Sequence, residues 1–473
     1  MRKPSLLLTL LPLLASACAA GPAYVPPQSP PAAAGPFISH AAGIDAARDL
    51  PADWWRLYRD PALDDLIAQA FAANTDLRVA SANLAKARAV MQEARAGRLP
   101  GTDVSGGVGY GNSVQSGLSG GSDPQWSYSG DFGLSWEADL FGRIGRAVEA
   151  ASADAEAVEA ARDAVRVTVA AETTRAYLDA CASAHGLSVA EQSLQVSTES
   201  LRLVTMQEQA GSASRLDIER AAAAEASARA ALPTFEGQRQ VARFELAALL
   251  GTTPDKVPEA ALGCVMPPEP AASIPVGDGA ALLRRRPDLR EAERRLAADT
   301  ARIGVATAEL YPSISLGGSG SFLRNDQVRG SDSFSFSLGP LLSWRFPNVS
   351  VARARLRQAE AQGDASLATF DGKVVTALKE VEQALTLVDT EQRRLVALSE
   401  AQERSQRAYA LADRRYRAGS IGWLDVLTAQ SDLLATRAAY AASLRQLSLA
   451  RVDLFKALGG GWQDAVAAER AIQ

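Results

Sequence analysis

The stretch WSYSGDFGLSW, at residues 126–136, decides the fold predicted for this chain. Its even positions carry aromatic or aliphatic side chains, with Gly130 as the one gap, whereas its odd positions carry Ser, Gly and one Asp. A period of two residues indicates a β-strand with one apolar and one wet face. FSFSLGPLLSW at 334–344 repeats the pattern, and residues 103–110 and 313–322 alternate more weakly. The sequence therefore predicts four strands.

This alternation fits two kinds of sheet. A soluble antiparallel sheet over a core has one apolar face, but here the other face is almost all Ser and Gly, and aromatic residues gather toward the strand ends. Segments of about ten residues with these features are typical of outer-membrane β-barrels. The residues expected to face lipid are Trp126, Tyr128, Phe132, Trp136, Phe334, Phe336 and Trp344. Pro340 predicts a bulge or bend in the fourth strand, because proline donates no hydrogen bond to a ladder.

Four strands are too few for a closed barrel, since the smallest bacterial examples have about eight. An open sheet in lipid would leave the backbone groups at its edges without hydrogen-bond partners. Several chains must therefore contribute strands to one barrel, and closed cyclic symmetry is the usual arrangement. The strand pattern alone allows two, three or four chains.

The chain also contains an internal duplication with an offset of 208 residues. AGSASRLDIE at 210–219 returns as AGSIGWLDVL at 418–427, and ARFELAALLG at 242–251 returns as ARVDLFKALG at 450–459. Each half reads as helix, two strands, long helix, turn and long helix. Such a repeat has to be recognised before the fold is assigned.

The predicted organisation follows from this repeat. It consists of a signal peptide at 1–17, a lipidated extended segment at 18–60, a first repeat at 61–259, a Pro-rich linker at 260–275, a second repeat at 276–460 and a tail at 461–473. Strands are expected at about 102–112, 126–137, 312–322 and 333–345, and long helices at about 142–209, 213–250, 349–417 and 423–458. The predicted fold class is an α+β membrane protein with four transmembrane strands and long coiled-coil helices per chain.

The long helices are the second prominent feature. Residues 142–209 contain no Pro, and at 1.5 Å per residue such a helix spans about 100 Å. Heptad spacing is visible in Leu187, Leu194, Leu201, Val381, Val388, Leu395, Gln402, Tyr409, Tyr416, Leu433, Tyr440, Leu447 and Leu454. Seven-residue apolar spacing indicates helices packed side by side as coiled coils. Their wide polar faces favour a hollow wall over a solid bundle.

The two AGSxxxLD turns are expected at the periplasmic ends of these helices. Gly211 and Gly419 suit helix C-termini. One interpretation of Ser212, Asp217, Ser420 and Asp425 is N-terminal capping of the helices that follow. In a ring of chains Asp425 would also repeat at one height around a pore mouth, where rings of carboxylates select cations. The two interpretations are compatible.

The first residues, MRKPSLLLTLLPLLASAC, read as an export signal with a charged start, an apolar stretch and a small-residue cleavage site. Cys18 follows the small residues as in a bacterial lipobox, so we expect it to be the acylated first residue of the mature chain. The alternative is ordinary cleavage nearby, with Cys18 unmodified. No other segment reaches the roughly 20 apolar residues that a membrane-spanning helix needs.

Composition excludes several functions. The net charge is −5 with scattered basic residues, which does not fit nucleic-acid binding. The two histidines, His40 and His185, lie far apart, and the cysteines form no cluster, so neither a metal site nor a catalytic constellation is predicted. Cys181 and Cys264 would share an oxidising compartment, but their spacing does not determine whether they pair.

Several stretches resemble one known family. RRRPDLREAERRLAADTARIGVATAELYPSISL at 284–316, WEADLFGRI at 136–144 and RYRAGSIGWLDVLTAQ at 415–430 are similar to the outer membrane factor family, the TolC-like channels of tripartite pumps. DWWRLYRDPALDDLIAQAFAANTDL at 53–77 supports the match, and CAAGPAYVPP at 18–27 resembles the start of its NodT-type lipoprotein branch. The resemblance covers nearly the whole mature chain.

This resemblance implies a homotrimer with a 12-stranded barrel, continued by a periplasmic helical barrel. It also implies an outer-membrane location and contact of the hairpin tips with a periplasmic adaptor, the membrane fusion protein, which binds an inner-membrane transporter. The tip residues expected in that contact are Gly211, Ser212, Leu216, Asp217, Gly419, Ser420 and Leu424. Tyr416, Asp425 and Thr428 fall where the family has its entrance constriction, although Tyr416 also continues the heptad pattern. The chain departs from some members at Ile421 and Thr428, which replace a basic and an acidic residue.

The function favoured by the sequence is a passive exit duct for small toxic compounds in an RND-type efflux pump, opened by an iris-like movement of the second hairpin. A channel for one-step protein secretion is the alternative within the family. A non-conducting lipoprotein that bridges the periplasm is a second class, disfavoured by the exposed Trp and Phe faces. No enzyme activity and no cofactor, apart from the covalent lipid on Cys18, is predicted.

Overall fold

The computed structural model describes residues 20–28, 30–111, 124–270 and 273–462. The chain divides into two compact units. The first contains the segment up to Gln28, Asn83–Glu159 and Glu291–Asp371, and the second contains the remaining segments. Each unit draws on both halves of the duplicated sequence, so a compact unit and a sequence repeat are different divisions of this chain.

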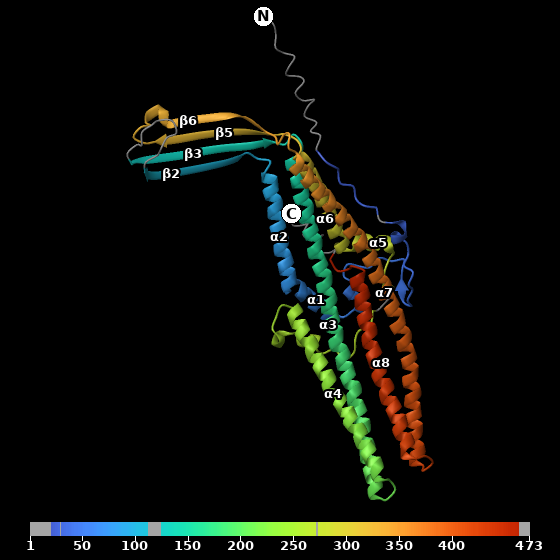
Figure 1. The fold of residues 1–473 in the computed structure, drawn as a ribbon. Coiled ribbons are helices and arrows are strands. Elements are labelled where there is room, and N and C mark those ends of the chain that lie inside the picture. The colour runs from blue at the N-terminus through green and yellow to red at the C-terminus, as the bar shows by residue number, and fades with distance from the viewer. Residues whose placement is uncertain (1–19, 29, 112–123, 271–272, 463–473) are drawn as a thin grey trace. The chain divides into compact units, whose positions relative to one another are not determined.

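The first unit contains a four-stranded antiparallel sheet (Figure 1). Its strands are β2 (Gly101–Gly111), β3 (Gln125–Ala138), β5 (Ser313–Arg324) and β6 (Phe334–Ser343), in the order β2-β3-β5-β6. All four bounds lie within two residues of the ranges predicted from the alternation. Strands of 10 to 14 residues reach the length of about 9–11 residues that a tilted transmembrane strand needs.

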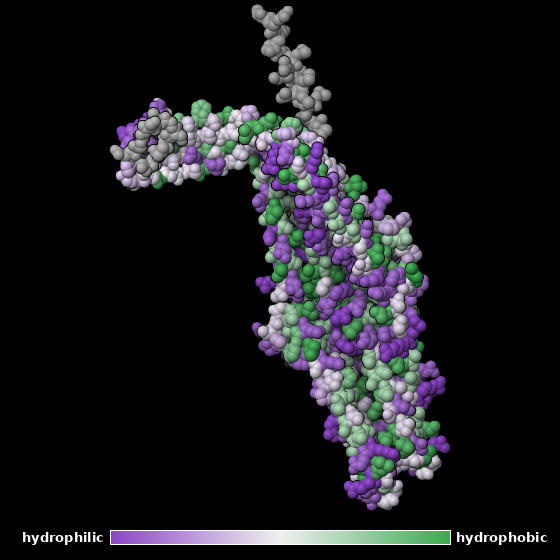
Figure 2. Space-filling model, viewed as in Figure 1, coloured by the Kyte–Doolittle hydropathy of each residue, from purple (hydrophilic) through white to green (hydrophobic). Residues whose placement is uncertain are grey.

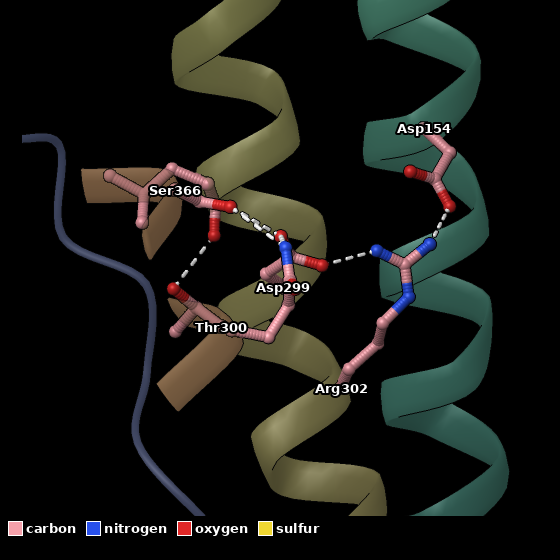
Figure 3. A network of polar contacts seen from close by, with 7 residues as sticks. Asp154, Asp299, Thr300, Arg302 and Ser366 are labelled. Atoms are coloured by element: carbon pink, nitrogen blue, oxygen red, sulfur yellow. Dashed lines mark hydrogen bonds and ion pairs between the residues drawn. The ribbon is translucent and has the colours of Figure 1, made fainter. Parts of the chain in front are cut away.

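The helical part of the first unit comprises the adjoining segments of α2 (Thr75–Ala96), α3 (Arg143–Gln209), α6 (Pro287–Ala308) and α7 (Ser350–Arg417). Figure 3 shows the polar contacts that join three of these helices. Arg302 of α6 pairs with Asp154 of α3 and with Asp299 of its own helix. Asp299 is buried and also accepts a hydrogen bond of 2.5 Å from the hydroxyl of Ser366 on α7. The buried carboxylate is thus satisfied by partners on both sides.

The second unit contains two long helical hairpins. The remainder of α3 packs with α4 (Arg215–Leu249), and the remainder of α7 with α8 (Trp423–Ala457). These four helices also lie within two residues of their predicted ranges. The buried heptad positions of α7 and α8 are Val381, Val388, Leu433, Leu447 and Leu454. Figure 2 shows hydrophilic and hydrophobic residues interspersed on the visible face of the helices, as expected for narrow apolar seams.

Ion pairs link α3 to α8 within this unit. The carboxylate of Asp179 lies 2.8 Å from Arg445, that of Glu172 lies 2.7 Å from Lys456, and Arg175 pairs with Asp453. These pairs are partly exposed, so each contributes little on its own. Together they hold the second hairpin against the first, at positions in α3 and α8 that are far from the two turns.

Residues 30–60, which belong to the second unit, pack on the helices of that unit. The indole of Trp54, which is fully buried, stacks on Phe455 of α8 with ring centroids 4.5 Å apart. The short strand β1 (Ile44–Asp45) pairs in parallel with β4 (Ile274–Pro275). The smaller elements are α1 (Pro61–Ala73), α5 (Gly279–Arg285) and the 3-10 turns Pro31–Ala34, Trp54–Tyr58, Pro254–Lys256, Glu259–Ala261 and Gly330–Ser333.

A disulfide joins Cys181 of α3 to Cys264 in the Pro-rich segment between the repeats. Their pairing was left open by the sequence, because 83 residues separate them. The bond closes a loop that contains all of α4 and its turn.

Within the described part of the chain, none of the helices combines the length and the apolar character that crossing a membrane requires.

Candidate channel wall and entrance

The strand register places most apolar residues of the four strands on one face; Leu323 and Leu341 lie on the other. Phe132 pairs with Val104 of β2 on one side and Gly320 of β5 on the other, and Trp136 pairs with Leu316. All seven residues expected to face lipid are exposed in the isolated chain, from 38% for Trp136 to 91% for Phe336. A broad apolar face that the chain does not cover itself indicates contact with lipid or a partner.

The opposite face of the sheet carries small polar residues. The hydroxyls of Ser319 and Ser337 lie 2.8 Å apart, and those of Ser321 and Ser335 lie 2.6 Å apart. On β3 the hydroxyl of Ser127 donates to a β2 carbonyl. Cross-strand hydroxyl pairs stabilise a sheet face that meets water. This face therefore suits the lining of a wet lumen.

Aromatic residues mark both ends of the sheet. At one end the indole nitrogens of Trp136 and Trp344 donate to carbonyl oxygens just beyond α2 and α6, at 3.0 and 3.2 Å. At the other end Tyr110 packs against Trp126 and Phe322 against Phe334, with ring centroids 5.3 and 5.1 Å apart. Two aromatic bands around an apolar zone are the arrangement found at the two interfaces of a membrane barrel.

The sheet has two open edges, formed by β2 and β6. Pro340 lies on the edge strand β6, opposite Leu316, in a ladder whose register runs without interruption from Ser313–Ser343 to Phe322–Phe334. The predicted bulge at Pro340 is therefore wrong, whereas the alternative of a bend stays a prediction. An edge strand tolerates proline because only one side of the strand is paired within the chain.

The two hairpin turns have the same backbone geometry. Gly211 and Gly419 adopt φ of 76° and 72°, in the left-handed region that glycine favours. The residue after each glycine donates its backbone N–H to a carbonyl five positions earlier: Ser212 to Gln207, and Ser420 to Arg415. No atom lies within 4 Å of the position where a Cβ of either glycine would stand, so both turns are open to solvent or to a partner.

The structure corrects the capping roles predicted for the two serines. The hydroxyls of Ser212 and Ser420 donate to carbonyl oxygens of the preceding helices, at 3.0 and 2.9 Å, so they cap helix ends and not helix starts. The left-handed glycine reverses the chain and brings the next residue back over those free carbonyls. The capping roles predicted for Asp217 and Asp425 are confirmed, because each carboxylate accepts a backbone N–H three residues earlier, at the start of its helix.

The cap of α4 is more complete than that of α8. Ser214 accepts the N–H of Asp217 while Asp217 accepts the N–H and hydroxyl of Ser214, which forms a capping box. These hydrogen bonds hold the pKa of the Asp217 carboxyl below its usual value. Gly422 replaces the serine at the start of α8, so only the Asp425 half of the motif exists there. Ser214 was missed in the sequence, although its position three residues before Asp217 is the capping-box signal.

The predicted gate residues have different surroundings. Tyr416 donates its hydroxyl to the side-chain oxygen of Gln207 on the other hairpin, and its ring packs 5.3 Å from that of Trp423. Burial raises the pKa of the Tyr416 phenol, and nearby Asp217 adds to the rise. Thr428 donates its hydroxyl to the Leu424 carbonyl of its own helix. Within one chain only Tyr416 of the three connects the hairpins.

An apolar cluster beside Tyr416 was missed in the sequence. Val204, Ala221, Trp423 and Val426 are buried together where the two hairpins end. The leucines of the two LD motifs point elsewhere: Leu216 and Leu424 remain 57% and 55% exposed. Each hairpin end thus combines a buried contact between hairpins with exposed leucines and open glycine turns.

Cys18, the signal peptide and residues 463–473 of the predicted tail lie outside the described residues.

Comparison with known proteins identifies the family. The outer membrane efflux protein family matches residues 66–252 and 280–460, which together exceed half of the chain. Nodulation protein T of Rhizobium leguminosarum bv. viciae is 32% identical over 459 residues, covering 96% of this chain and 92% of its own. The toluene efflux pump outer membrane protein TtgC of Pseudomonas putida is 32% identical over 479 residues, covering 98% and 97%.

The fold agrees with this assignment. The solved structure of the outer-membrane channel OprN superposes with a TM-score of 0.87 and 35% sequence identity, covering 94% of this chain and all of that one. The paired helical hairpins and the four-stranded sheet are thus the fold of an outer-membrane channel subunit. The chain belongs to the outer membrane efflux protein family, whose members are TolC-like channels of the outer membrane.

Proposed function

We propose that three copies of this chain form the outer-membrane exit channel of an RND-type tripartite efflux pump. One observation carries the proposal: each chain has a four-stranded sheet with an aromatic-flanked apolar face, a serine-lined face and two open edges. Edges without partners are not tolerated in lipid. Pairing β2 of one chain with β6 of the next removes every edge, and three chains give twelve strands.

In this arrangement the apolar face meets lipid and the serine face lines the lumen. The long helices continue the duct through the periplasm and carry the two glycine turns to its inner entrance. The channel supplies no energy itself; an inner-membrane transporter, linked through an adaptor, would drive small toxic compounds into it. Support comes from the relative named as the outer membrane protein of a toluene efflux pump.

The hairpin ends would form the adaptor contact. Their open glycines and exposed leucines offer a surface for helical partners, built from Gly211, Ser212, Leu216, Asp217, Gly419, Ser420 and Leu424. Tyr416, Asp425 and Thr428 would surround the entrance, with Asp425 exposed and repeated three times around it. A lipid on Cys18 would anchor the chain independently of the barrel. No catalytic residue or other cofactor is assigned.

The proposal is tested by expressing the chain in a strain that lacks its outer-membrane efflux channels. The expected protein is a detergent-soluble trimer that shifts to monomer on heating, conducts ions in planar bilayers and restores resistance to small toxic compounds when the adaptor and transporter are present. Restored export of a polypeptide without small-compound resistance would favour the secretion alternative. A water-soluble monomer that does not conduct would refute a channel altogether.

A further inference from the structure

Three buried polar side chains connect the two hairpins away from their turns. Gln430 on α8 is 1% exposed, and both ends of its amide bind α3. Its oxygen accepts the hydroxyl of Ser200 at 2.8 Å, and its nitrogen donates to the hydroxyl oxygen of Ser197 at 3.1 Å. Ser197 and Ser200 are themselves buried. We call these three residues the clip.

The clip differs from two other buried serines of the same helices. Ser193 on α3 and Ser448 on α8 each donate to a carbonyl four residues back in their own helix, at 2.8 and 2.9 Å. Those hydrogen bonds persist whether or not the hairpins touch. The bonds of Gln430 exist only while α8 lies against α3, and separation would leave buried polar groups without partners unless water entered.

The packing next to the clip is loose. A pocket of about 400 Å³, partly open to solvent in the single chain, lies between α3, α4 and α8 and is lined by residues that include Gly186, Ala228, Leu434 and Gln430. Along this stretch the hairpins leave the pocket unfilled, so the contacts next to it are the clip on one side of the helices and the apolar cluster at the hairpin ends.

The clip lies at the same distance from the contacts at the hairpin ends on both helices. Gln430 follows Trp423 by seven residues, which is about 10 Å along α8. Ser200 precedes Gln207, the partner of Tyr416, by the same seven residues on α3. Apolar contacts such as those of Trp423 allow sliding, whereas hydrogen bonds require defined distances and angles. A single buried amide is known to fix the register of packed helices.

We infer that Gln430 is a positioning residue of the channel entrance: with Ser197 and Ser200 it holds the second hairpin in one register against the first and so maintains the resting state. The inference rests on the proposed channel function. Displacement of the second hairpin by an adaptor would have to break both amide bonds, and the neighbouring pocket gives α8 room to move once they are broken.

The test replaces Gln430 by Met, which keeps the length of the side chain and removes its hydrogen bonds. A second variant, Ser197→Ala with Ser200→Ala, removes the same bonds from the other side. Ser448→Ala is the matched control, because it deletes a buried hydroxyl bonded only within α8. Trimers of each are reconstituted in planar bilayers without adaptor, and the fraction of time in the conducting state is compared.

We expect a rise of about tenfold in conducting time for Gln430→Met and for the double serine variant, equivalent to about 1.4 kcal/mol, and no rise for Ser448→Ala. Combining all three clip substitutions should add nothing to Gln430→Met alone, because the same bonds are lost. Unchanged conduction in both clip variants would overturn the inference. So would an equal rise in the Ser448→Ala control, which would indicate general loosening.

A second readout separates this inference from the channel proposal. Amide hydrogen exchange of residues 423–440 in the intact trimer should become faster in the clip variants and remain unchanged in Ser448→Ala, with equal heat resistance of all the trimers. If the natural trimer never conducts, the channel proposal fails while faster exchange still supports the clip. If the natural trimer conducts but the clip substitutions change neither its amide hydrogen exchange nor its conduction, only the inference about the clip is refuted.

Discussion

Replacement of Leu338 by Arg tests the orientation of the sheet most directly. Leu338 lies halfway along β6, opposite Gly318 of β5, and is 69% exposed on the apolar face. Its neighbour Ser337 points to the other face, where its hydroxyl meets that of Ser319. The two adjacent positions therefore report on lipid and lumen at nearly the same depth.

The expected free-energy cost of Leu338→Arg depends on the depth of this position in the bilayer. An Arg on the lipid face of a barrel costs about 2–4 kcal/mol at the bilayer midplane and about 0–1 kcal/mol near the interfaces. Leu338 is at the middle of its strand, and three copies in one barrel would bring the total to about 6–12 kcal/mol. This is comparable to the whole stability of a typical domain, about 5–15 kcal/mol. Phe334→Arg, at the aromatic end of β6, should cost much less.

The assay is the yield of heat-modifiable trimer in the outer membrane, followed by denaturant unfolding of the purified protein in liposomes. Leu338→Arg should assemble poorly, Phe336→Arg at an intermediate level, and Phe334→Arg nearly normally. Leu338→Met controls for loss of the leucine shape, and Ser337→Arg controls for the charge. Equal yields of Leu338→Arg and Ser337→Arg trimers would refute the assignment of the two faces.

Three further predictions concern other parts of the chain. Cys18→Ser should abolish labelling by palmitate while leaving trimer formation largely intact; labelling that persists would refute Cys18 as the anchor. Asp425→Asn should raise the conductance or weaken the cation preference of reconstituted trimers. It should destabilise the start of α8 by about 1 kcal/mol, because one backbone hydrogen bond is involved. Unchanged single-channel traces would remove Asp425 from the entrance. Cys181→Ser combined with Cys264→Ser should lower the free energy of unfolding by about 2–5 kcal/mol, as loss of a native disulfide usually does, and a reductant should have the same effect on the natural protein but none on the variant.

Local patterns predicted the elements of this fold well. The strands follow from the alternation of apolar and small polar residues. The long helices follow from their heptad spacing and, except in α4 with its internal Pro233, from the lack of Pro. The bounds of both differ from the structure by at most two residues. The bulge at Pro340 was wrong because the register between β5 and β6 continues through the proline, and the alternation within one strand does not reveal that register. The caps at Ser212 and Ser420 were wrong because the left-handed glycine redirects the serine to the preceding helix.

Contacts between residues far apart in the chain could not be predicted from the sequence, for a physical reason. Gln430 and its serine partners are separated by more than 200 residues, and nothing in the local sequence of either helix distinguishes a buried amide from an exposed one. The disulfide between Cys181 and Cys264 has the same character, since the loop between them can close in many ways. Such contacts depend on how the hairpins pack, and helical periodicity does not specify that.

Sequence divergence after the duplication explains why the two hairpins are not equivalent. The glycine turns share one geometry at an offset of 208 residues, but the residues that connect the hairpins near their ends do not repeat: Tyr416, Trp423 and Gln430 correspond to Glu208, Arg215 and Ala222. Each of these three contacts therefore uses a residue that only the second half possesses. In a ring of three chains, with two hairpins from each, duplication alone would make every interface between hairpins nearly alike. In the proposed trimer, the substitutions in the second hairpin would make the interface within a chain chemically different from the interface between chains, so the entrance would have threefold and not sixfold symmetry.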